Sequence, residues 1–481
     1  MKNIQYYFCL YSVIIILLFS LPLYSQTEAA PPPNIDDPDV GQESNPYQIT
    51  NFANLKWLSD QEWNEETDNN FYIQTADIDA SETADWENGL GFMPIGRYEF
   101  PYYGFIGSYN GNHHTISNLY VYDPSTRFIG LFGDIKNSHI FDLSLENVTI
   151  NIFSLNTGFG SLVAHAFNSQ ITNCFVSGNV FSIGAPFGIT GGGLVGAALY
   201  SEINNSHALV DFDFNQIYPF GNNWIGGLVG YLGASTLRNS FYIGNALMPN
   251  YTGNSPTCFG GIAEWVAWRE YILPFYLGST VENVYSVATV EGAEIVSGFA
   301  TLIEDSSFIN SFWNMEVSEF DGDFYLIEGE NIISNNYGLT TEQMKQATPY
   351  IENGWDFENI WGIDPEINNG YPYLLNSSLV STKDIHIISN HNILRGNYPN
   401  PFNPSTTISY HLNMPRSVNI SVYNIKGQLI KVLVNEGMEA GNNSVVWNGD
   451  DTSGKSVSSG IYFYKMETEF GIDIKKMLLL K

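Results

Sequence analysis

Few residues of this 481-residue chain have the type and spacing needed for chemistry. His113 and His114 are adjacent, but no third metal ligand follows nearby. A zinc site usually takes three or more protein ligands, so a structural role is favoured for this pair. Three carboxylate pairs could bind calcium, although none lies in a twelve-residue calcium loop, and a solvated face is the simpler interpretation. They are Asp77 with Asp79, Asp211 with Asp213, and Asp321 with Asp323.

A catalytic constellation is equally hard to assemble. Polysaccharide-cleaving enzymes pair carboxylates, or add a basic residue that stabilises the developing charge. Residues 46–376 contain no Asp-Asp pair and no Gly-His-Gly, and their basic residues are Lys56, Arg97, Arg127, Lys136, Arg238, Arg269 and Lys345. The sequence therefore predicts no catalytic, cofactor-binding or metal-binding residue and no cofactor. Structural calcium stays an open alternative, as does an extracellular polysaccharide lyase or glycoside hydrolase with an unrecognised acidic pair.

The composition excludes several partners. Fifty Asp and Glu against 18 Lys and Arg give a net charge of -32, which repels nucleic acid and anionic lipid. Residues 26–382 carry 42 acidic and 7 basic residues, whereas residues 383–481 carry 8 acidic and 10 basic ones. Apolar residues at 44% are sufficient for a core, and 44 Gly favour turns and strands.

The N-terminus has the pattern of an export signal. Lys2 is followed by the apolar run Leu10–Leu23 and the small residue Ser25, which predicts a signal peptide over residues 1–25. An uncleaved anchor is the alternative, although the run is short for a membrane span. Residues 26–45, which contain three consecutive prolines, are predicted to be an extended linker.

Two motifs repeat together through the middle of the chain. The first is Gly or Ser, two apolar residues and a small residue, and its copies lie 26 to 37 residues apart. Their first apolar residues are Phe105, Leu131, Leu162, Leu194, Leu228, Ile262 and Phe299. The second is an apolar residue two places before Asn or Asp. Its copies are Ile116 with Asn118, Ile140 with Asp142, Ile171 with Asn173, Ile203 with Asn205, Leu237 with Asn239, Val281 with Asn283, and Phe308 with Asn310.

These short alternating runs are typical of strands that must stack to bury their apolar side chains. They predict a parallel β-solenoid over residues 46–336, with one coil per repeat and the second motif's apolar residues in one inward column. Asn tolerates a left-handed corner and can hydrogen-bond to its neighbour one strand away, so the Asn column is predicted to be a structural ladder. A polar binding row is the alternative. Cys174 is predicted to be a buried small residue, and with Cys258 it makes no disulfide framework.

The repeats resemble a known family. Gly-Gly-Leu-Val-Gly at 192–196 and 226–230, each followed by Asn-Ser, is similar to the GLUG-motif repeats of bacterial surface proteins. The resemblance extends to Tyr47–Leu58, Ile73–Asp79, Gly111–Leu119, Gly338–Met344, Trp355–Phe357 and Asn369–Leu374. It implies a right-handed parallel β-helix in an exported, adhesin-like protein without a family-wide catalytic residue. The fifth repeat departs from the pattern. Insertions after Cys258 and around residues 265–277 predict a loop that protrudes or caps a groove, and ligand contact there is a hypothesis.

Residues 337–376 are predicted to cap the solenoid. Thr340 with Gln343 indicates a capping box at the start of a short helix over residues 341–347. The aromatic side chains that follow are predicted to block the exposed end of the last coil, with sugar-binding platforms as the alternative. They are Trp355, Phe357, Trp361, Tyr371 and Tyr373.

The pattern changes after a predicted linker at residues 377–395. Residues 396–481 show six strands separated by turn residues, which indicates an Ig-like β-sandwich. The predicted strands are 406–412, 418–423, 428–434, 443–447, 461–468 and 472–480. Three segments and the ending Lys475–Lys481 resemble the C-terminal sorting domain of type IX secretion, and also the Ig-like domain of flagellar hook-capping proteins. The segments are Asn397–Pro404, Tyr423–Gly427 and Ser459–Tyr464.

The sequence as a whole predicts an all-β chain in which a right-handed parallel β-helix precedes an Ig-like β-sandwich. We expect an adhesin-like binding protein, secreted or on the outer surface of a Gram-negative bacterium, that is not an enzyme. Its expected partners are the type IX secretion machinery, through the C-terminal domain, and a glycan or another surface. No nucleic acid is expected, and a membrane is involved only through export or surface attachment.

Overall fold

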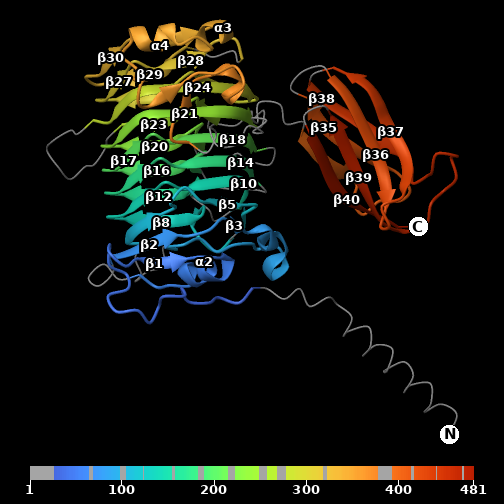
Figure 1. Cartoon of the computed structure of the whole chain (residues 1–481). Coiled ribbons are helices and arrows are strands. Elements are labelled where there is room, and N and C mark those ends of the chain that lie inside the picture. The colour runs from blue at the N-terminus through green and yellow to red at the C-terminus, as the bar shows by residue number, and fades with distance from the viewer. Residues whose placement is uncertain are drawn as a thin grey trace. The chain divides into compact units, whose positions relative to one another are not determined.

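The computed structural model describes residues 27–63, 69–97, 104–122, 124–153, 158–182, 189–214, 223–248, 257–267, 278–317, 322–377, 393–412, 416–439, 441–468 and 471–480. The chain divides into two compact units, Met1–Lys383 and Asp384–Lys481 (Figure 1). The predicted signal peptide, most of the predicted linker at 377–395, and residues 268–277 of the fifth-repeat loop lie outside the described residues.

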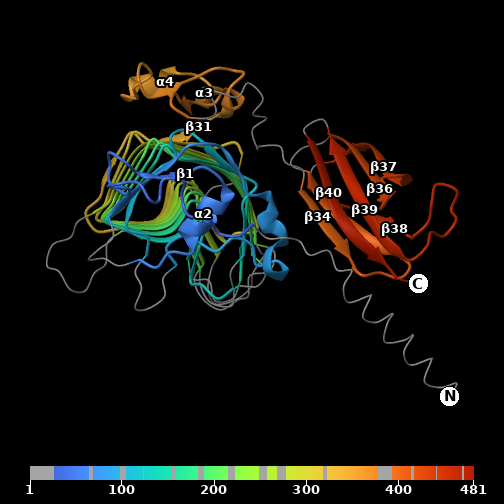
Figure 2. The same ribbon diagram turned by 60° about the horizontal axis from the view of Figure 1, so that its bottom comes forward.

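The first unit is a parallel β-helix built from three stacks of strands (Figures 1 and 2). Stack A comprises β7 Phe128–Ile129, β11 Gly158–Gly160, β15 Thr190–Gly192, β19 Asn223–Gly226, β22 Thr257–Gly260 and β25 Ile295–Ser297. Stack B comprises β8 Phe132–Lys136, β12 Val163–Phe167, β16 Val195–Leu199, β20 Val229–Gly233, β23 Ala263–Val266, β26 Ala300–Glu304 and β29 Phe324–Glu328. The first repeated motif, Gly or Ser followed by two apolar residues, forms the turn between these two stacks.

Stack C contains the remaining solenoid strands. The apolar residue of the second repeated motif lies on strands of this stack. It comprises β1 Tyr47–Ile49, β2 Asn70–Gln74, β3 Ile78–Asp79, β4 Gly107–Asn110, β5 Thr115–Ser117, β6 Tyr120–Val121, β9 His139–Phe141, β10 Ser144–Ile152, β13 Gln170–Thr172, β14 Phe175–Ser182, β17 Glu202–Asn204, β18 His207–Asp213, β21 Thr236–Leu247, β24 Thr280–Glu291, β27 Ser307–Ile309, β28 Phe312–Asn314, β30 Ile332–Ser334 and β31 Tyr337–Leu339.

The inward column exists, with one correction. Parallel pairing aligns Ile140, Ile171, Ile203, Leu237, Val281 and Phe308, and all six are fully buried. Ile116 does not belong to this column, because it pairs with Leu145 whereas Ile140 pairs with Tyr109. Phe105 is likewise misaligned with Leu131, since it bridges to Ile135. The first coils differ in length from the later ones, so counting from one motif copy to the next loses the register there.

The Asn column forms the left-handed corner that was predicted. Its residues all have φ between 48° and 59°. Amide contacts run between coils, such as Asn173 Nδ2 to Asp142 Oδ1 at 2.9 Å and Asn283 Nδ2 to Asn239 Oδ1 at 3.2 Å. Asn118 again belongs to a different corner, where it accepts from Asn147. The ladder is not continuous, since the Oδ1 atoms of Asn173, Asn205 and Asn283 are buried without a hydrogen-bond partner.

A buried serine ladder supports the adjacent corner and was not predicted. Each backbone N–H donates to the serine Oγ of the following coil, which satisfies a donor that would otherwise be orphaned. The bonds are Ser138 to Ser169 (3.1 Å), Ser169 to Ser201 (3.0 Å), Ser201 to Ser235 (2.9 Å), Ser235 to Ser279 (3.2 Å) and Ser279 to Ser306 (3.1 Å).

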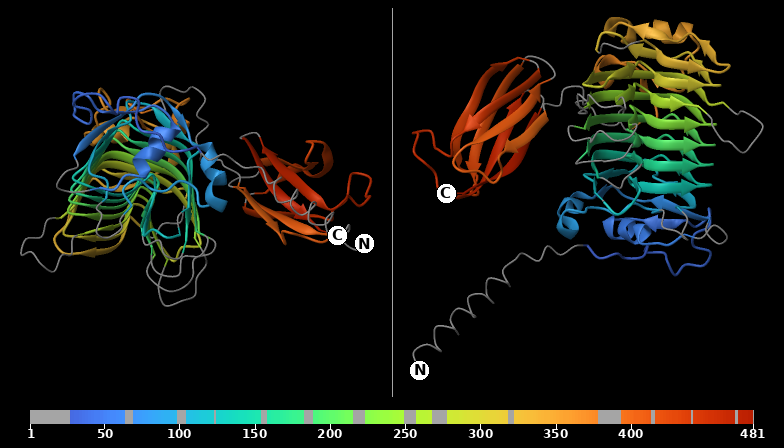
Figure 3. Two further views of the ribbon diagram at one scale, coloured as in Figure 1. Left: turned by 90° about the horizontal axis from the view of Figure 1, so that it is seen from below. Right: turned by 180° about the vertical axis from the view of Figure 1, so that it is seen from behind.

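The N-terminal end of the solenoid is closed. Helix α2, Phe52–Ser59, begins at the N-cap Asn51, whose side chain accepts from the Asn54 N–H, and buries Leu55 and Leu58 completely (Figure 3). The described part of the predicted extended linker, residues 27–45, is instead folded against this end through turns. The Ala30 N–H donates to Ala53 O at 3.0 Å, and Asn34 is 6% exposed. The first coils also contain the 3-10 helix η1, Ser81–Asn88.

Residues 337–376 were predicted to cap the other end of the solenoid, but they do not close it. Helix α3, Thr341–Met344, does begin with the predicted Thr340–Gln343 capping box, and α4 Thr348–Glu352 follows. Residues 345–377, which include α4, are here called the strap. The strap runs over the outside of stack C through β32 Trp361–Gly362, η2 Asn368–Gly370 and β33 Tyr373–Leu374. Inward positions of the last coil stay open, with Ile327 52% and Ile333 42% exposed.

The strap covers a column of outward-facing rings on stack C. This outer column comprises Phe175, His207, Phe241, Tyr285 and Phe312, aligned by the strand register. Trp361 of the strap lies 6.1 Å from both Phe241 and Tyr285, and the Tyr285 hydroxyl donates to Pro372 O at 2.6 Å. The strap's Trp355, Trp361, Tyr371 and Tyr373 are at most 9% exposed, so they are not open sugar platforms either.

The second unit is a seven-stranded antiparallel sandwich. One sheet holds β34 Ile393–Tyr398, β35 Thr406–Leu412 and β38 Gly441–Trp447, and the other holds β36 Arg416–Asn424, β37 Leu429–Met438, β39 Gly460–Thr468 and β40 Gly471–Leu479. The six predicted strands are confirmed. The seventh, β34, begins inside the predicted linker, and its Leu394 joins Trp447 in the core between the sheets.

Candidate binding site

An aromatic groove lies on the outside of the β-helix where stacks A and B meet. Its cavity has a volume of about 190 Å³. Stack A contributes Phe128, Gly158, Thr190 and Trp224 in register, and stack B contributes Ala197, Tyr231 and Trp265 in register. Small residues therefore form the middle of the groove, and large rings stand at its two ends. We call these residues the aromatic groove.

The rings at each end hold one another in place. Trp265 packs edge-on against Trp224 at 5.0 Å and against Tyr231 at 5.3 Å. At the other end Phe128 stacks on His165 at 5.1 Å, and His165 Nδ1 lies 2.6 Å from Asp134 Oδ1. Phe128 and Trp224 are three coils apart, about 14 Å at the usual strand spacing. The groove thus offers half-buried ring faces to an extended ligand.

One carboxyl beside the groove has altered acidity. Glu264 precedes Trp265 and is 4% exposed, and burial raises its pKa to about 7. The Thr301 hydroxyl donates to its Oε1 at 2.7 Å, whereas Oε2 has no partner. Burial also raises the pKa of the neighbouring Cys258 thiol to about 12, helped by the negative charge of Glu264. That thiol is therefore a poor nucleophile.

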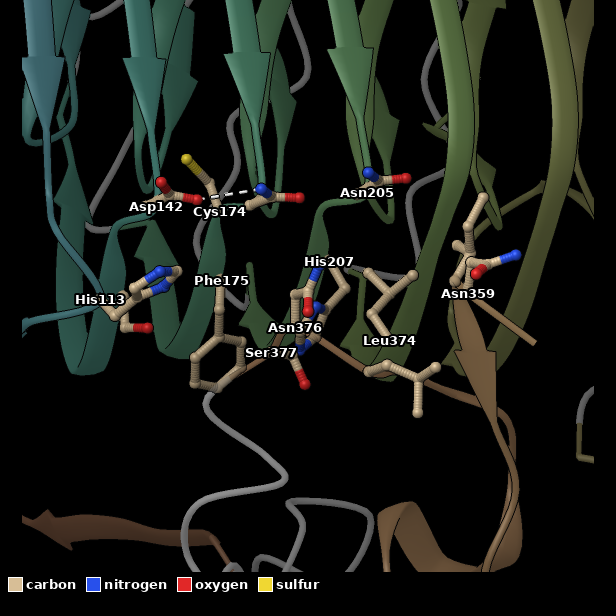
Figure 4. Close-up of a pocket in the computed structure, with 14 residues that line it drawn as sticks. His113, Asp142, Cys174, Phe175, Asn205, His207, Asn359, Leu374, Asn376 and Ser377 are labelled. Atoms are coloured by element: carbon tan, nitrogen blue, oxygen red, sulfur yellow. Dashed lines mark hydrogen bonds between the residues drawn. The ribbon is translucent and has the colours of Figure 1, made fainter. Parts of the chain in front are cut away.

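A second cavity lies between stack C and the strap (Figure 4). This strap pocket has a volume of about 330 Å³. The solenoid side contributes Asp142, Asn173, Asn205, Phe175 and His207, and the strap side contributes Ile360, Leu374, Leu375, Asn376 and Ser377. His113 also lines the pocket.

His207 is the most unusual group in the strap pocket. Its ring stacks on Phe175 at 4.7 Å and on Phe241 at 4.4 Å, so both of its faces are covered by rings. It is 1% exposed, and neither ring nitrogen has a hydrogen-bond partner. Burial lowers the pKa of His207 to about 3, so the ring is neutral at physiological pH.

The residues singled out in the sequence are mostly engaged in structural contacts. His114 Nδ1 lies 3.1 Å from Asp77 Oδ1, which also accepts from the Thr115 N–H. Asp79 accepts from Asn118 and Ser81, which lowers its pKa. Asp211 accepts from Asn245, and Asp321 lies outside the described residues. The prediction for Cys174 is confirmed, since it is 1% exposed and burial raises its pKa to about 12.

The aromatic groove was missed, although the sequence contains its signal. Thr190 and Trp224 each lie four residues before the Leu of the repeat motif, and Ala197, Tyr231 and Trp265 each lie three residues after the motif's first apolar residue. Large aromatic residues at these outward positions occur in only some coils. Aligning the coils on the repeat motif and comparing the residues at one fixed distance from it would have placed these aromatic residues together.

Two searches of the described part of the chain gave negative results. Within it, no three His, Cys, Asp or Glu side chains come close enough to hold a metal ion. None of its helices combines the length and the apolar character that crossing a bilayer requires.

Comparisons with known proteins bear on both units. A family model described as a secretion system C-terminal sorting domain matches residues 397–480. Halomucin from Haloquadratum walsbyi is 34% identical over 175 residues, which is 36% of this chain and 2% of halomucin. A Gly-rich membrane protein from Evansella cellulosilytica is 29% identical over 141 residues, which is 29% of this chain and 14% of that protein. The chain thus spans only a small part of either relative.

Among solved structures, an IgA1 protease aligns with 64% of this chain and 24% of its own, at 16% identity and a TM-score of 0.41. The matched C-terminal region coincides with the antiparallel sandwich, β34 to β40. That domain implies interaction with the type IX secretion machinery. The chain is therefore a protein with a β-helix body that is sorted by a type IX C-terminal domain and is secreted, or held at the cell surface, by a Gram-negative bacterium.

Proposed function

We propose that the β-helix is an adhesin-like binding module of the GLUG-repeat kind, and that its aromatic groove binds an extended glycan. The observation that carries the proposal is the pair of ring clusters about 14 Å apart by strand spacing, joined by a floor of small residues. Flat apolar rings pack against the C–H faces of sugar rings, and an open floor leaves room for a chain of them.

The charge of the module favours a neutral or amino-bearing glycan. Residues 26–382 have a net charge of -35. A surface of one sign repels ligands of the same sign over several ångströms, so uronic-acid polymers and nucleic acids are disfavoured. Asp134, at the Phe128 end of the groove, adds to this preference.

An enzyme is the alternative, and one residue favours it. Glu264 is a carboxyl with a pKa near 7 beside the groove, and a general acid needs such a proton at neutral pH. However, Glu264 is not among the residues that line the groove, and its Oε1 accepts from the Thr301 hydroxyl, which keeps it from a substrate there. We therefore expect binding without turnover.

The test compares the purified chain with single-site variants on an array of neutral, amino and acidic glycans. Trp224→Ala and Trp265→Ala each remove a ring from the groove and should weaken glycan binding by about tenfold or more, as for a buried aromatic anchor. Tyr325→Ala is the matched control, because Tyr325 is a 57% exposed aromatic residue on β29, outside the groove. Its binding should equal that of the wild type.

Three results would contradict the proposal. Equal loss in Tyr325→Ala and Trp224→Ala would indicate unspecific adhesion of exposed rings. Binding that neither tryptophan variant changes would place the ligand elsewhere. Release of reducing ends from any bound polysaccharide, lost in Glu264→Gln, would establish the enzyme instead.

A further inference from the structure

We propose that the strap pocket is a second, separate binding site, and that it takes one small, neutral, hydroxyl-rich ring such as a monosaccharide or the terminal residue of a glycan. The pocket lies on stack C, whereas the aromatic groove lies between stacks A and B, so the two sites use different residues. The inference holds whether or not the groove binds a glycan.

The unpartnered polar atoms of the pocket indicate a ligand that forms hydrogen bonds with them. Both nitrogens of His207 and the Oδ1 atoms of Asn173 and Asn205 are buried without hydrogen bonds. Leaving a buried polar group unsatisfied costs about 1–3 kcal/mol for each group. The Oγ atom of Ser377, on the strap side of the pocket, is unpartnered as well, so five such atoms gather on one cavity. Each unsatisfied buried polar group in a native structure calls for an explanation, and a bound ligand explains all five together.

The geometry of His207 decides what those atoms can bind. Phe175 and Phe241 cover its faces at 4.7 Å and 4.4 Å, so its hydrogen bonds can form only in the ring plane. A neutral imidazole presents one donor and one acceptor. Hydroxyl groups both donate and accept, so adjacent hydroxyls on one ring can satisfy the imidazole and still donate to the two amide oxygens.

The remaining walls select against charge. Asp142 faces the pocket and receives a hydrogen bond from Asn173 Nδ2, so its carboxylate disfavours an anionic ligand. The apolar part of the wall comes from Phe175, Ile360, Leu374 and Leu375. Further polar groups come from His113, Ser144, Asn359, Asn376 and Ser377. A volume of about 330 Å³ lies at the lower end of the usual range for ligand sites, which suits a ligand of one ring.

The experiment measures binding of individual probes to the full chain by titration calorimetry. The probes are glucose, galactose, mannose and N-acetylglucosamine, their methyl glycosides, and the matching uronic acids. At least one neutral sugar should bind the wild type, and its uronic acid should bind more weakly. Comparing the free sugar with its methyl glycoside distinguishes a monosaccharide ligand from the end of a chain.

Two variants and one control separate binding from folding. His207→Phe keeps the stack with Phe175 and Phe241 but removes both nitrogens, so it should weaken sugar binding by about tenfold or more without lowering the unfolding temperature. Asn205→Gly keeps the left-handed corner, where φ is 50°, and removes one amide, so it should also weaken binding. His139→Phe is the control. This half-buried histidine stacks on Phe141 at 4.4 Å outside the pocket and should not matter.

The proposal is overturned if no neutral sugar binds the wild type, because the unpaired atoms would then be satisfied by water alone. It is equally overturned if His207→Phe and Asn205→Gly bind as the wild type does. Loss of the same binding in Trp224→Ala, with both pocket variants unaffected, would assign the sugar to the aromatic groove. Retention in Trp224→Ala together with loss in the pocket variants supports the strap pocket.

Discussion

Single buried polar residues tell most about this chain, because the coil geometry hides side chains that are usually exposed. Asp211, on the outward face of β18, is 2% exposed and accepts two hydrogen bonds through Oδ1, from the N–H and the Nδ2 of Asn245. Its Oδ2 has no partner. Burial raises its pKa from 3.8 to about 7, and the Asn245 bonds offset only part of that shift.

The raised pKa of Asp211 predicts a pH-dependent stability. The folded state binds this proton more tightly than the unfolded state, so the associated stability is present below pH 4 and is lost as the pH rises to about 7. The shift corresponds to at most roughly 4 kcal/mol. Asp211→Asn resembles the protonated carboxyl and keeps the Oδ1 acceptor. It should therefore raise the free energy of unfolding at pH 8 and leave it nearly unchanged at pH 4.

Denaturant unfolding of the wild type and Asp211→Asn at both pH values checks this prediction. The difference between the two proteins matters, because many surface carboxylates titrate in both alike. Asp213→Asn, two residues further on the same strand and half-buried, serves as the comparison. An equal gain from Asp211→Asn at pH 4 and pH 8 would mean that the ionised carboxylate is not the cause.

At the scale of elements, side-chain ladders between coils supply hydrogen-bond partners for the buried backbone groups at the corners. The serine ladder runs through Ser138, Ser169, Ser201, Ser235, Ser279 and Ser306, and each member lies two residues before an inward apolar residue. A small hydroxyl fits the buried corner and also donates back to its own coil, as Ser201 Oγ does to Leu199 O at 2.8 Å. The serine ladder thus links the corners of successive coils by hydrogen bonds, and the serine side chain is small enough for the buried corner.

Removal of one rung should destabilise the solenoid. Ser201→Ala leaves the Ser169 N–H buried without its acceptor, which was 3.0 Å away, and should lower the free energy of unfolding by about 1–3 kcal/mol. Thermal unfolding followed by circular dichroism measures the loss. Ser307→Ala, at a half-buried position on β27, should change little, and a similar loss in both variants would argue against the ladder.

The elements also show which features a single sequence can predict. The strands, their inward column and the left-handed corner could be predicted, because each depends on a motif of a few residues. That motif recurs once per coil, at a spacing near 32 residues. The placement of the strap depends on contacts such as Tyr285 with Pro372, which are 87 residues apart and leave no local pattern. The strap pocket was missed for the same reason, although three of its residues, Asp142, Asn173 and Asn205, belong to the predicted Asn column.

At the scale of the whole molecule, charge and function are divided between the two units. The solenoid segment, residues 26–382, carries a net charge of -35, whereas residues 383–481 carry +2. Self-repulsion of this size opposes association of the solenoids, even though the last coil exposes Tyr325, Ile327 and Ile333. The nearly neutral sandwich has its own core around Trp447 and does not share this repulsion.

Because the sandwich has its own core, export and binding should be separable by deletion. Removal of residues 397–481 takes away β35 to β40 and the last two residues of β34, and leaves the solenoid with its strap intact. In a host with type IX secretion, the truncated chain should accumulate in the periplasm instead of reaching the surface or the medium. Cell fractionation and protease treatment of intact cells measure this. The full-length Trp224→Ala variant is the matched control, since it should be exported normally while binding glycan poorly. A truncated chain that still reached the surface would refute the assignment of sorting to the sandwich, because the solenoid would then contain an export determinant of its own.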